Sequence, residues 1–450
     1  MTATAETATG GATGFKRSLG LFDFTLLVIG AIVGDGIYVV GSLSAQAMGP
    51  AQIVAWAAGG ALAVLIGIAF VQCATIDAEV GGSYAYTRMA YGPYLGFIAG
   101  WTLYIGEWLA LSAFPTAFTR YFESLTRLDD SFGLAIKVAL IIGVTSVNLS
   151  GMRQGARAND FLTAAKLMPL ALIILAGLLF VILKPGVAQT NMTPFAPAGL
   201  GGFSSAILPI FWVYAGFELA VMPAAEVTAP HKTMPRGLII AMFVTTTFYM
   251  LVGLAMAVAL PWQEVAGSRY PLATVAGGLM QELGGPHGAG VFVLSLGGVV
   301  SVAGVFLVFT LALARLSYAL ANDGFFPSAF SWLSPGTRTP YVGILFQGAS
   351  SLVFSSLFGL GALLSTAVVF LSICYLLTSI SAMKLARLFP EEALHLPGLR
   401  SFLIGAALAS VFLTLQASVL QLAITLAALA AGSVIYRAQR HRLAVTPRLV

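Results

Sequence analysis

Charged side chains are scarce in this sequence. Only 9% of the 450 residues are Asp, Glu, Lys or Arg, whereas a soluble domain carries about 25%. Hydrophobic residues make up 58% of the chain, and its mean hydropathy is +0.93. This balance excludes an ordinary soluble protein and predicts that nearly the whole chain lies in a lipid bilayer. No polar block is long enough to form a separate soluble domain.

Cysteine and histidine are also rare. The two cysteines, Cys73 and Cys374, both fall in apolar segments, so neither a disulfide framework nor a zinc site is expected. No nucleophile–base pair or metal-ligand spacing appears around the histidines. The four histidines fall at expected loops or tails: His231, His287, His395 and His441. We therefore expect no enzyme, no metal and no cofactor.

The chain contains twelve apolar segments of the length that crosses a membrane as a helix, about 20 residues. A short flexible tail, residues 1–18, precedes them and ends in basic residues without the pattern of a signal peptide. The segments begin near Leu19, Ala51, Met89, Phe132, Ala158, Gly202, Gly237, Gly288, Tyr341, Gly361, Phe402 and Val419.

The basic residues test this topology. With the N-terminus inside, sixteen Lys and Arg residues fall on the cytoplasmic side and five on the opposite side, with Lys166 left inside a span. Cytoplasmic loops carry such an excess, so we expect a multi-pass protein of the inner (plasma) membrane with both termini in the cytoplasm. The net charge of +5 does not indicate nucleic-acid binding, because these residues punctuate the spans.

The first span carries an unusual stretch, GAIVGDGIY at 30–38. Each glycine inside a helix costs about 1 kcal/mol relative to alanine. An aspartate in the middle of a span costs roughly 2.5–3.5 kcal/mol on insertion scales. A plain anchor would have neither feature. We expect a broken helix whose exposed backbone binds a ligand, with these residues at the site: Ala31, Ile32, Val33, Gly34, Asp35 and Gly36.

A second weakened helix appears five spans later, where glycine and glutamate interrupt the run FWVYAGFE at 211–218. Broken helices at corresponding positions of two halves indicate an inverted-repeat transporter with a site at the membrane midplane. The expected division is a first five-helix repeat over 19–183, a second over 202–385, two further helices over 399–437 and a cytoplasmic tail over 438–450.

Three other segments accompany the 30–38 stretch in chain order. They are EVGGSYAYTR at 79–88 running into YGPYLG at 91–96, AEVTAP with PR at 225–236, and ARLSYALANDG with RTP at 314–340. Together the four resemble motifs of the amino acid–polyamine–organocation transporter superfamily, in its bacterial amino-acid permease branch. The resemblance implies an all-α fold of twelve helices, a five-plus-five inverted repeat (LeuT-like) with discontinuous helices one and six, and alternating access. It also implies secondary transport of amino acids or amines.

Asp35 departs from the family pattern, which usually has serine or another small residue between those two glycines. A carboxylate there would occupy or repel the place where a substrate carboxylate normally lies. Either Asp35 is protonated, which burial favours, or it is ionised and pairs with a substrate cation. The plain alternative is that Asp35 caps the second half-helix and touches no substrate.

The resemblance places Trp212 where an aromatic ring covers the substrate, with Ala215 and Gly216 forming the second break. A tryptophan face attracts cations, although Trp212 can equally be an ordinary packed aromatic. Phe211 and Tyr214 are weaker candidates for the same site.

Two glutamates also lie within spans. Glu218 is either a carboxylate that carries a proton or gates the site, or a favourable acid in the first turn of a half-helix. Glu107 either lines the pocket or pairs with another polar group.

Lys166 lies on span five, near half depth at about 1.5 Å per residue. In proton-coupled relatives, a lysine on this helix resembles a built-in cation that replaces a bound sodium between spans one, five and eight. The alternative is a lysine that extends to the cytoplasmic face. We therefore assign proton coupling to Lys166, Asp35 and Glu218.

The resulting expectation is a secondary transporter of an amino acid or organic amine, driven by protons. Its partners are that small molecule, protons and the lipid bilayer, and no oligomeric state is predicted. Two alternatives stay open. One is an exchanger that swaps an amino acid for an amine, and the other is a non-transporting nutrient receptor or scaffold of the membrane.

Overall fold

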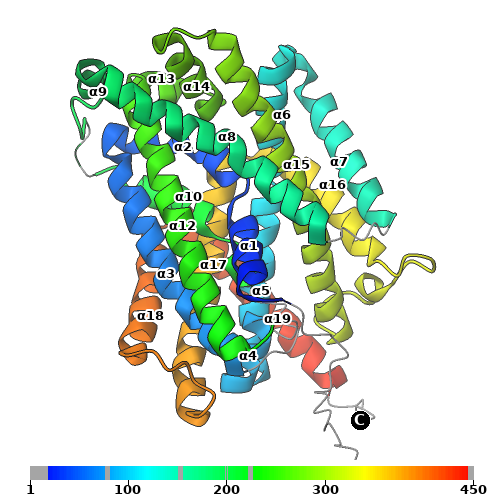
Figure 1. Cartoon of the computed structure of the whole chain (residues 1–450). Coiled ribbons are helices and arrows are strands. Elements are labelled where there is room, and N and C mark those ends of the chain that lie inside the picture. The colour runs from blue at the N-terminus through cyan, green and yellow to red at the C-terminus, as the bar shows by residue number, and fades with distance from the viewer. Residues whose placement is uncertain are drawn as a thin grey trace, which may run out of the picture.

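The computed structural model describes residues 19–76, 82–150, 156–197, 199, 201–220 and 227–443. Over these residues the fold is a bundle of helices, and the one β-bridge joins Leu19 to Val227. Long helices run up and down the bundle (Figure 1). The all-α prediction is therefore confirmed. The tail 1–18, the motif residues 79–81 and 225–226, and the end of the predicted C-terminal tail lie outside the described residues.

In the described residues, the first half of the chain holds one broken helix, four further spans and four short helices. Its helices are α1 (Leu21–Ile32), α2 (Gly36–Met48), η1 (Gly49–Ala51), α3 (Gln52–Ile76), α4 (Ser83–Tyr91), α5 (Pro93–Leu111), α6 (Phe114–Thr126), η2 (Asp130–Phe132), α7 (Gly133–Leu149), α8 (Ala156–Leu183) and α9 (Pro185–Asn191).

The second half repeats this order and adds two helices. Its helices are α10 (Phe203–Tyr214), α11 (Phe217–Ala220), α12 (Pro230–Ala259), α13 (Trp262–Gly267), α14 (Pro271–Glu282), α15 (His287–Asn322), η4 (Ser328–Ser331), α16 (Tyr341–Leu357), α17 (Leu360–Leu388), α18 (Leu399–Leu415) and α19 (Val419–Leu443).

The two halves have opposite orientations. Each begins with a broken helix and a long helix, and each then has short helices before its third span: α4 in the first half, α13 and α14 in the second. Figure 1 shows α4 at one end of the bundle and α13 and α14 at the other. An inverted repeat places corresponding elements on opposite sides of the membrane in this way.

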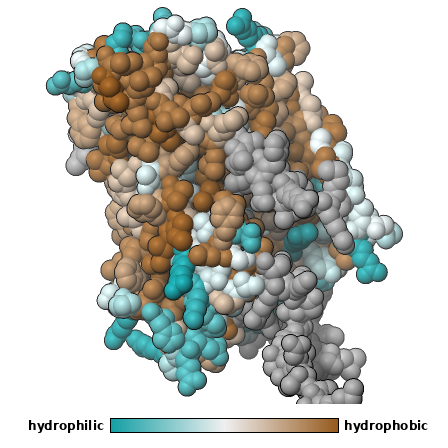
Figure 2. Space-filling view, viewed as in Figure 1, coloured by the Kyte–Doolittle hydropathy of each residue, from teal (hydrophilic) through white to brown (hydrophobic). Residues whose placement is uncertain are grey.

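The helices have the lengths and composition that a bilayer requires. Among the residues that the structure describes, eight helical runs are long and apolar enough to cross a membrane, and four shorter apolar helices accompany them. Two of the shorter ones, α1 and α10, are halves of the broken spans. On the face drawn in Figure 2, hydrophobic side chains cover the middle and hydrophilic ones gather toward the two ends.

The structure adds elements that hydropathy did not predict. The short helices α4, α9, α13 and α14 lie between spans, and span three is divided into α5 and α6 at Ser112 and Ala113. Pro115 lies in the first turn of α6. Since proline supplies no backbone N–H and crowds the preceding turn, a helix bends or restarts there.

The two broken spans meet at Gly216. Its φ is +116°, a conformation that residues with a side chain rarely adopt. A Cβ atom at this position would lie 2.5 Å from the Ala31 carbonyl oxygen. Glycine is therefore required here by both backbone conformation and space, and it sets how closely α10–α11 approaches α1–α2.

We expect Gly216→Ala to lower the melting temperature of the purified protein, because the strained backbone alone costs about 1–3 kcal/mol. The matched control is Gly143→Ala in α7, where a Cβ would meet no atom within 4 Å. Gly143→Ala should leave the melting temperature unchanged or raise it slightly. Equal melting curves for both variants would contradict the close approach at Gly216.

Candidate functional site

The break in span one frees backbone carbonyls that an unbroken helix would satisfy. Helix α1 ends at Ile32, helix α2 begins at Gly36, and Val33 between them is extended. The Tyr249 hydroxyl of α12 donates to the Ile32 carbonyl at 3.1 Å, and the Ser301 hydroxyl of α15 donates to the Gly34 carbonyl at 3.1 Å. Spans seven and eight therefore hold the break open.

A carboxylate stabilises the break in span six. Helix α10 ends at Tyr214, and Ala215 is extended before α11 begins at Phe217. The backbone N–H of Gly216 donates to Glu218 Oε2 at 2.9 Å, and the Tyr375 hydroxyl of α17 donates to Glu218 Oε1 at 3.0 Å. Glu218 thus ties its own half-helix to span ten.

A small cavity of about 10 Å³ lies between the two breaks. That volume suits about one water molecule, so an amino acid requires the cavity to widen. Gly36, which lines the cavity, leaves room for a close approach of the Val213 backbone, because a Cβ on Gly36 would lie 3.0 Å from Val213 Cα. The cavity is lined by Ala31, Ile32, Gly34, Asp35, Gly36, Trp212, Val213, Ala215, Val305 and Phe309.

Asp35 is the charged residue that lines this cavity. Its side chain is 3% exposed, stands at the N-cap position of α2 and makes no capping hydrogen bond. Oδ2 has no hydrogen-bond partner in the described part of the chain. Trp212 lies beside the carboxyl group, and Lys166 acts on it electrostatically. The arrangement leaves one carboxyl oxygen available to a ligand or a proton.

Lys166 reaches the same break from α8. It is 7% exposed, and its Cε lies 3.6 Å from where a Cβ on Gly304 of α15 would stand. The Tyr38 hydroxyl of α2 donates to the Lys166 carbonyl at 3.4 Å. No ion pair within 4.0 Å joins Lys166 to Asp35. The structure thus brings spans one, five and eight together around a buried lysine that does not extend to an exposed face.

Glu107 meets Glu218 across the interface of spans three and six. Glu107 is 1% exposed, and no N–H or hydroxyl group of the described chain donates to either of its oxygens. Among the charged groups around Glu107, the Glu218 carboxyl group has the strongest electrostatic effect on it, and Glu218 is equally buried. Two ionised carboxylates in contact repel each other, so this pair is suited to hold one proton between its members.

Aromatic side chains close one side of the cavity. The Trp212 ring lies 6.4 Å from the Phe309 ring and 6.4 Å from the Phe114 ring of α6, and Phe114 and Phe309 are 5.6 Å apart. These three rings connect spans three, six and eight. Opening the cavity on this side therefore requires the aromatic cluster to separate.

The remaining predicted residues do not line the cavity. Val33 and Gly216 belong to the breaks, and Phe211 packs against Tyr375 with ring centroids 6.0 Å apart. The Tyr214 hydroxyl donates to the Trp56 carbonyl of α3 at 2.9 Å.

Sequence reasoning missed several residues of the site. Val213, Val305 and Phe309 line the cavity, while Tyr249, Ser301 and Tyr375 satisfy the breaks. One signal was present, because positions 301, 305 and 309 repeat every four residues and so share one face of α15.

Two motifs of the sequence meet at the end of the bundle where α4 lies. The Tyr84 hydroxyl donates to Asp323 Oδ2 at 2.6 Å, and Arg88 lies 3.9 Å from the same oxygen. Burial, together with this bond to Asp323, raises the pKa of Tyr84 to about 12. The contact links α4 to the end of α15.

Comparisons of the sequence with known proteins identify its family. The sequence profile of the family described as "Amino acid permease" matches residues 19–442. A branched-chain amino acid permease of Bacillus subtilis is 28% identical over 411 residues, which cover 87% of this chain and 86% of that protein. A methylthioribose transporter of the same organism is 28% identical over 83% of this chain and 82% of its own. Its serine/threonine exchanger is 28% identical over 76% of each chain.

The hydrogen bond from α15 to the first break gives a prediction. Ser301→Ala leaves the buried Gly34 carbonyl without its donor, which costs about 1–3 kcal/mol, so the melting temperature should fall. Ser317→Ala is the control on the same helix, because the Ser317 hydroxyl bonds only the Ala314 carbonyl of its own turn. If Ser317→Ala destabilised the protein as much as Ser301→Ala, the hydrogen bond from Ser301 to the break would contribute no more to stability than a hydrogen bond within one helical turn.

Proposed function

The chain belongs to the amino acid permease family, and we propose that it takes up an amino acid or an organic amine together with protons. Its relatives are permeases and transporters rather than enzymes, and its apolar helices make it a multi-pass membrane protein. The observation that carries the proposal is the meeting of two helix breaks at one buried point, Gly216 against Ala31. Unwound backbone at the midplane is what a small polar substrate needs in a bilayer.

The substrate site we propose lies in the cavity between the breaks. The first N–H groups of α2 have no helical partner and carry the positive end of its dipole, so they suit a substrate carboxylate. Asp35 then faces the substrate amine, and Trp212 covers the molecule. The residues proposed to bind are Ala31, Ile32, Gly34, Asp35, Gly36, Trp212 and Ala215, with Val33, Glu107, Phe211, Tyr214 and Gly216 supporting them.

Proton coupling is proposed for Lys166, Asp35 and Glu218. Lys166 and Asp35 stand on two sides of the first break without a direct ion pair, so a proton or a substrate amine can change their interaction. Glu218 and Glu107 can hold a second proton on the other side of the cavity. A buried lysine between spans one, five and eight places a permanent part of the protein where a sodium ion would otherwise be needed.

Alternating access follows from the size of the cavity. At about 10 Å³ the site is contracted, so a bundle of spans one, two, six and seven must move against α15 and the rest before substrate enters. In this proposal the repeats run over 19–183 and 202–385, both termini lie in the cytoplasm, and the protein sits in the plasma membrane. Closure then re-forms the contacts of Trp212 with Phe309 and Phe114.

Exchange is the second mode to test, because one relative is named a serine/threonine exchanger. An exchanger would show counterflow in preloaded vesicles without a proton gradient. A receptor would bind ligand, but vesicles containing only this protein would show no flux.

Proteoliposomes test the coupling. We expect an acidic outside to drive uptake of a labelled amino acid and a protonophore to abolish it. For one proton per substrate, a gradient of one pH unit, about 1.4 kcal/mol, supports about tenfold accumulation. Replacing sodium with choline should change nothing. Uptake that requires sodium at fixed pH would overturn the role given to Lys166.

Asp35→Asn tests specificity at nearly constant shape. Loss of a charge-assisted hydrogen bond costs about 1.5–3 kcal/mol, which is roughly a tenfold to hundredfold weaker apparent affinity. We expect a loss of that size for amines and cationic amino acids and an altered pH profile of uptake. Asp129→Asn, at a fully exposed aspartate between α6 and η2, is the matched control. Unchanged selectivity and pH dependence in Asp35→Asn would refute the assignment.

A further inference from the structure

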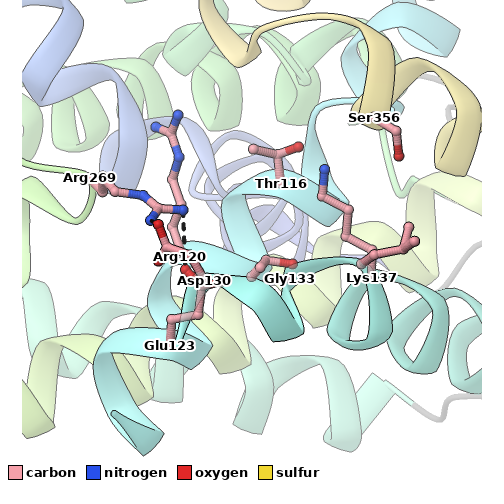
Figure 3. A pocket seen from close by; sticks show the side chains of 10 residues that line it. Thr116, Arg120, Glu123, Asp130, Gly133, Lys137, Arg269 and Ser356 are labelled. Atoms are coloured by element: carbon pink, nitrogen blue, oxygen red, sulfur yellow. Dashed lines mark hydrogen bonds and ion pairs between the residues drawn. The ribbon is translucent and has the colours of Figure 1, made fainter. Parts of the chain in front are cut away.

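A second and larger cavity opens at the end of the bundle opposite α4. Its volume is about 410 Å³, within the range of small-molecule sites. Its walls come from α6, from η2 and α7, from the connection between α13 and α14, and from the end of α16. Figure 3 shows the charged side chains around it, with Arg120 and Lys137 on either side of Thr116.

Positive charge exceeds negative charge in this cavity. Arg120, Lys137 and Arg269 line it together with Glu123 and Asp130. Arg269 lies between the two acids, 3.2 Å from Glu123 Oε2 and in contact with Asp130. Lys137 Nζ donates to the Ser355 carbonyl at 2.7 Å. The two carboxylates are thus largely engaged by Arg269, and a net positive charge remains on Arg120 and Lys137.

Arg120 carries an unused guanidinium group. It is half-buried, and in the described ranges it forms neither an ion pair within 4.0 Å nor a hydrogen bond. An arginine stays charged in proteins and offers five N–H donors arranged to match a carboxylate. Such a group in a cavity invites an anionic ligand oxygen.

Glu123 supplies the complementary group. The side chain is 7% exposed, and its Oε1 has no hydrogen-bond partner among the described residues. That oxygen lies 3.3 Å from where a Cβ on Gly133 would stand, so the glycine keeps the approach from the cavity clear. An unpartnered carboxylate oxygen invites a cationic donor.

We propose that this cavity binds an α-amino acid before it reaches the central site, with the carboxylate on Arg120 and the ammonium on Glu123. The two residues are three apart on α6, so they share one face with Cβ atoms about 5–6 Å apart. That spacing fits two opposite charges carried by neighbouring atoms of one molecule. The proposal rests on the proposed function for the substrate class and for the outward direction of this face.

The same helix leads from the outer cavity to the central site. Tyr121 follows Arg120 in the sequence, and its hydroxyl donates to the Tyr38 carbonyl of α2. Phe114 at the start of α6 packs against Trp212 and Phe309. An amino acid held on α6 therefore lies next to the half-helix and the aromatic cluster that must move for it to enter.

A single reporter cysteine tests binding without requiring transport. Ser356 is exposed and lines the cavity, whereas the native Cys73 and Cys374 are buried. In full-length Ser356→Cys protein in nanodiscs, L-leucine should slow modification by a charged methanethiosulfonate. By mass action the slowing is about tenfold at ten times its Kd. We expect no protection from 4-methylpentanoate, which lacks the ammonium, or from 3-methylbutylamine, which lacks the carboxylate.

Variants and competing ligands complete the test. Arg120→Gln in the same background should remove protection, whereas Arg120→Lys should retain part of it; melting curves check the fold. Absence of leucine protection in Ser356→Cys protein overturns the site. Equal protection by 4-methylpentanoate or by inorganic phosphate also overturns it, because that result describes a plain anion site. If leucine still protects the Ser356→Cys protein while vesicles containing the protein show no uptake, the proposed function fails and the outer site remains supported.

Discussion

A backbone carbonyl buried in a membrane must find a donor within the protein, and this requirement organises the centre of the molecule. Breaking span one between Ile32 and Gly36 releases carbonyls that no water can reach cheaply. Tyr249 and Ser301 supply the donors. Spans seven and eight are thereby fixed to the break, and Gly216 fixes the second broken span against the first. The proposed ligand site is the space left between these constraints.

Four buried ionisable side chains lie at or near the two breaks in two different combinations, and Asp35 is the one that lines the cavity. Asp35 and Lys166 have opposite charges and share the break of span one, while Glu107 and Glu218 have like charges and face each other across spans three and six. When both members are ionised, the first combination is attractive and the second is repulsive. Attraction at one break and repulsion at the other are the electrostatic basis of the proposed proton coupling.

The sequence allowed the broken helices to be located because their residues are costly in a span. Glycines and a carboxylate at 30–38 and at 211–218 stand out against an apolar background. The same background hides Val305 and Phe309, since an apolar residue that lines a cavity reads like one that faces lipid. Glu107 could be recognised as unusual, but its contact with Glu218 depends on helix packing over more than a hundred residues of chain. Short helices such as α13 were not predicted, because hydropathy detects membrane spans and not the helices that connect them.

The interruption of span three between α5 and α6 has a mechanical consequence. Helix α5 carries Glu107, and α6 carries Arg120, Tyr121 and the ring of Phe114. A rigid rod would transmit any tilt at the outer end directly to the carboxyl pair. The turn at Ser112 and Ala113 separates the helix that carries Arg120 from the helix that carries Glu107. Arg120 in the lining of the larger cavity and Glu107 of the carboxyl pair therefore lie on separate helices of one span, so a tilt of one helix need not reach the other as a rigid-body movement.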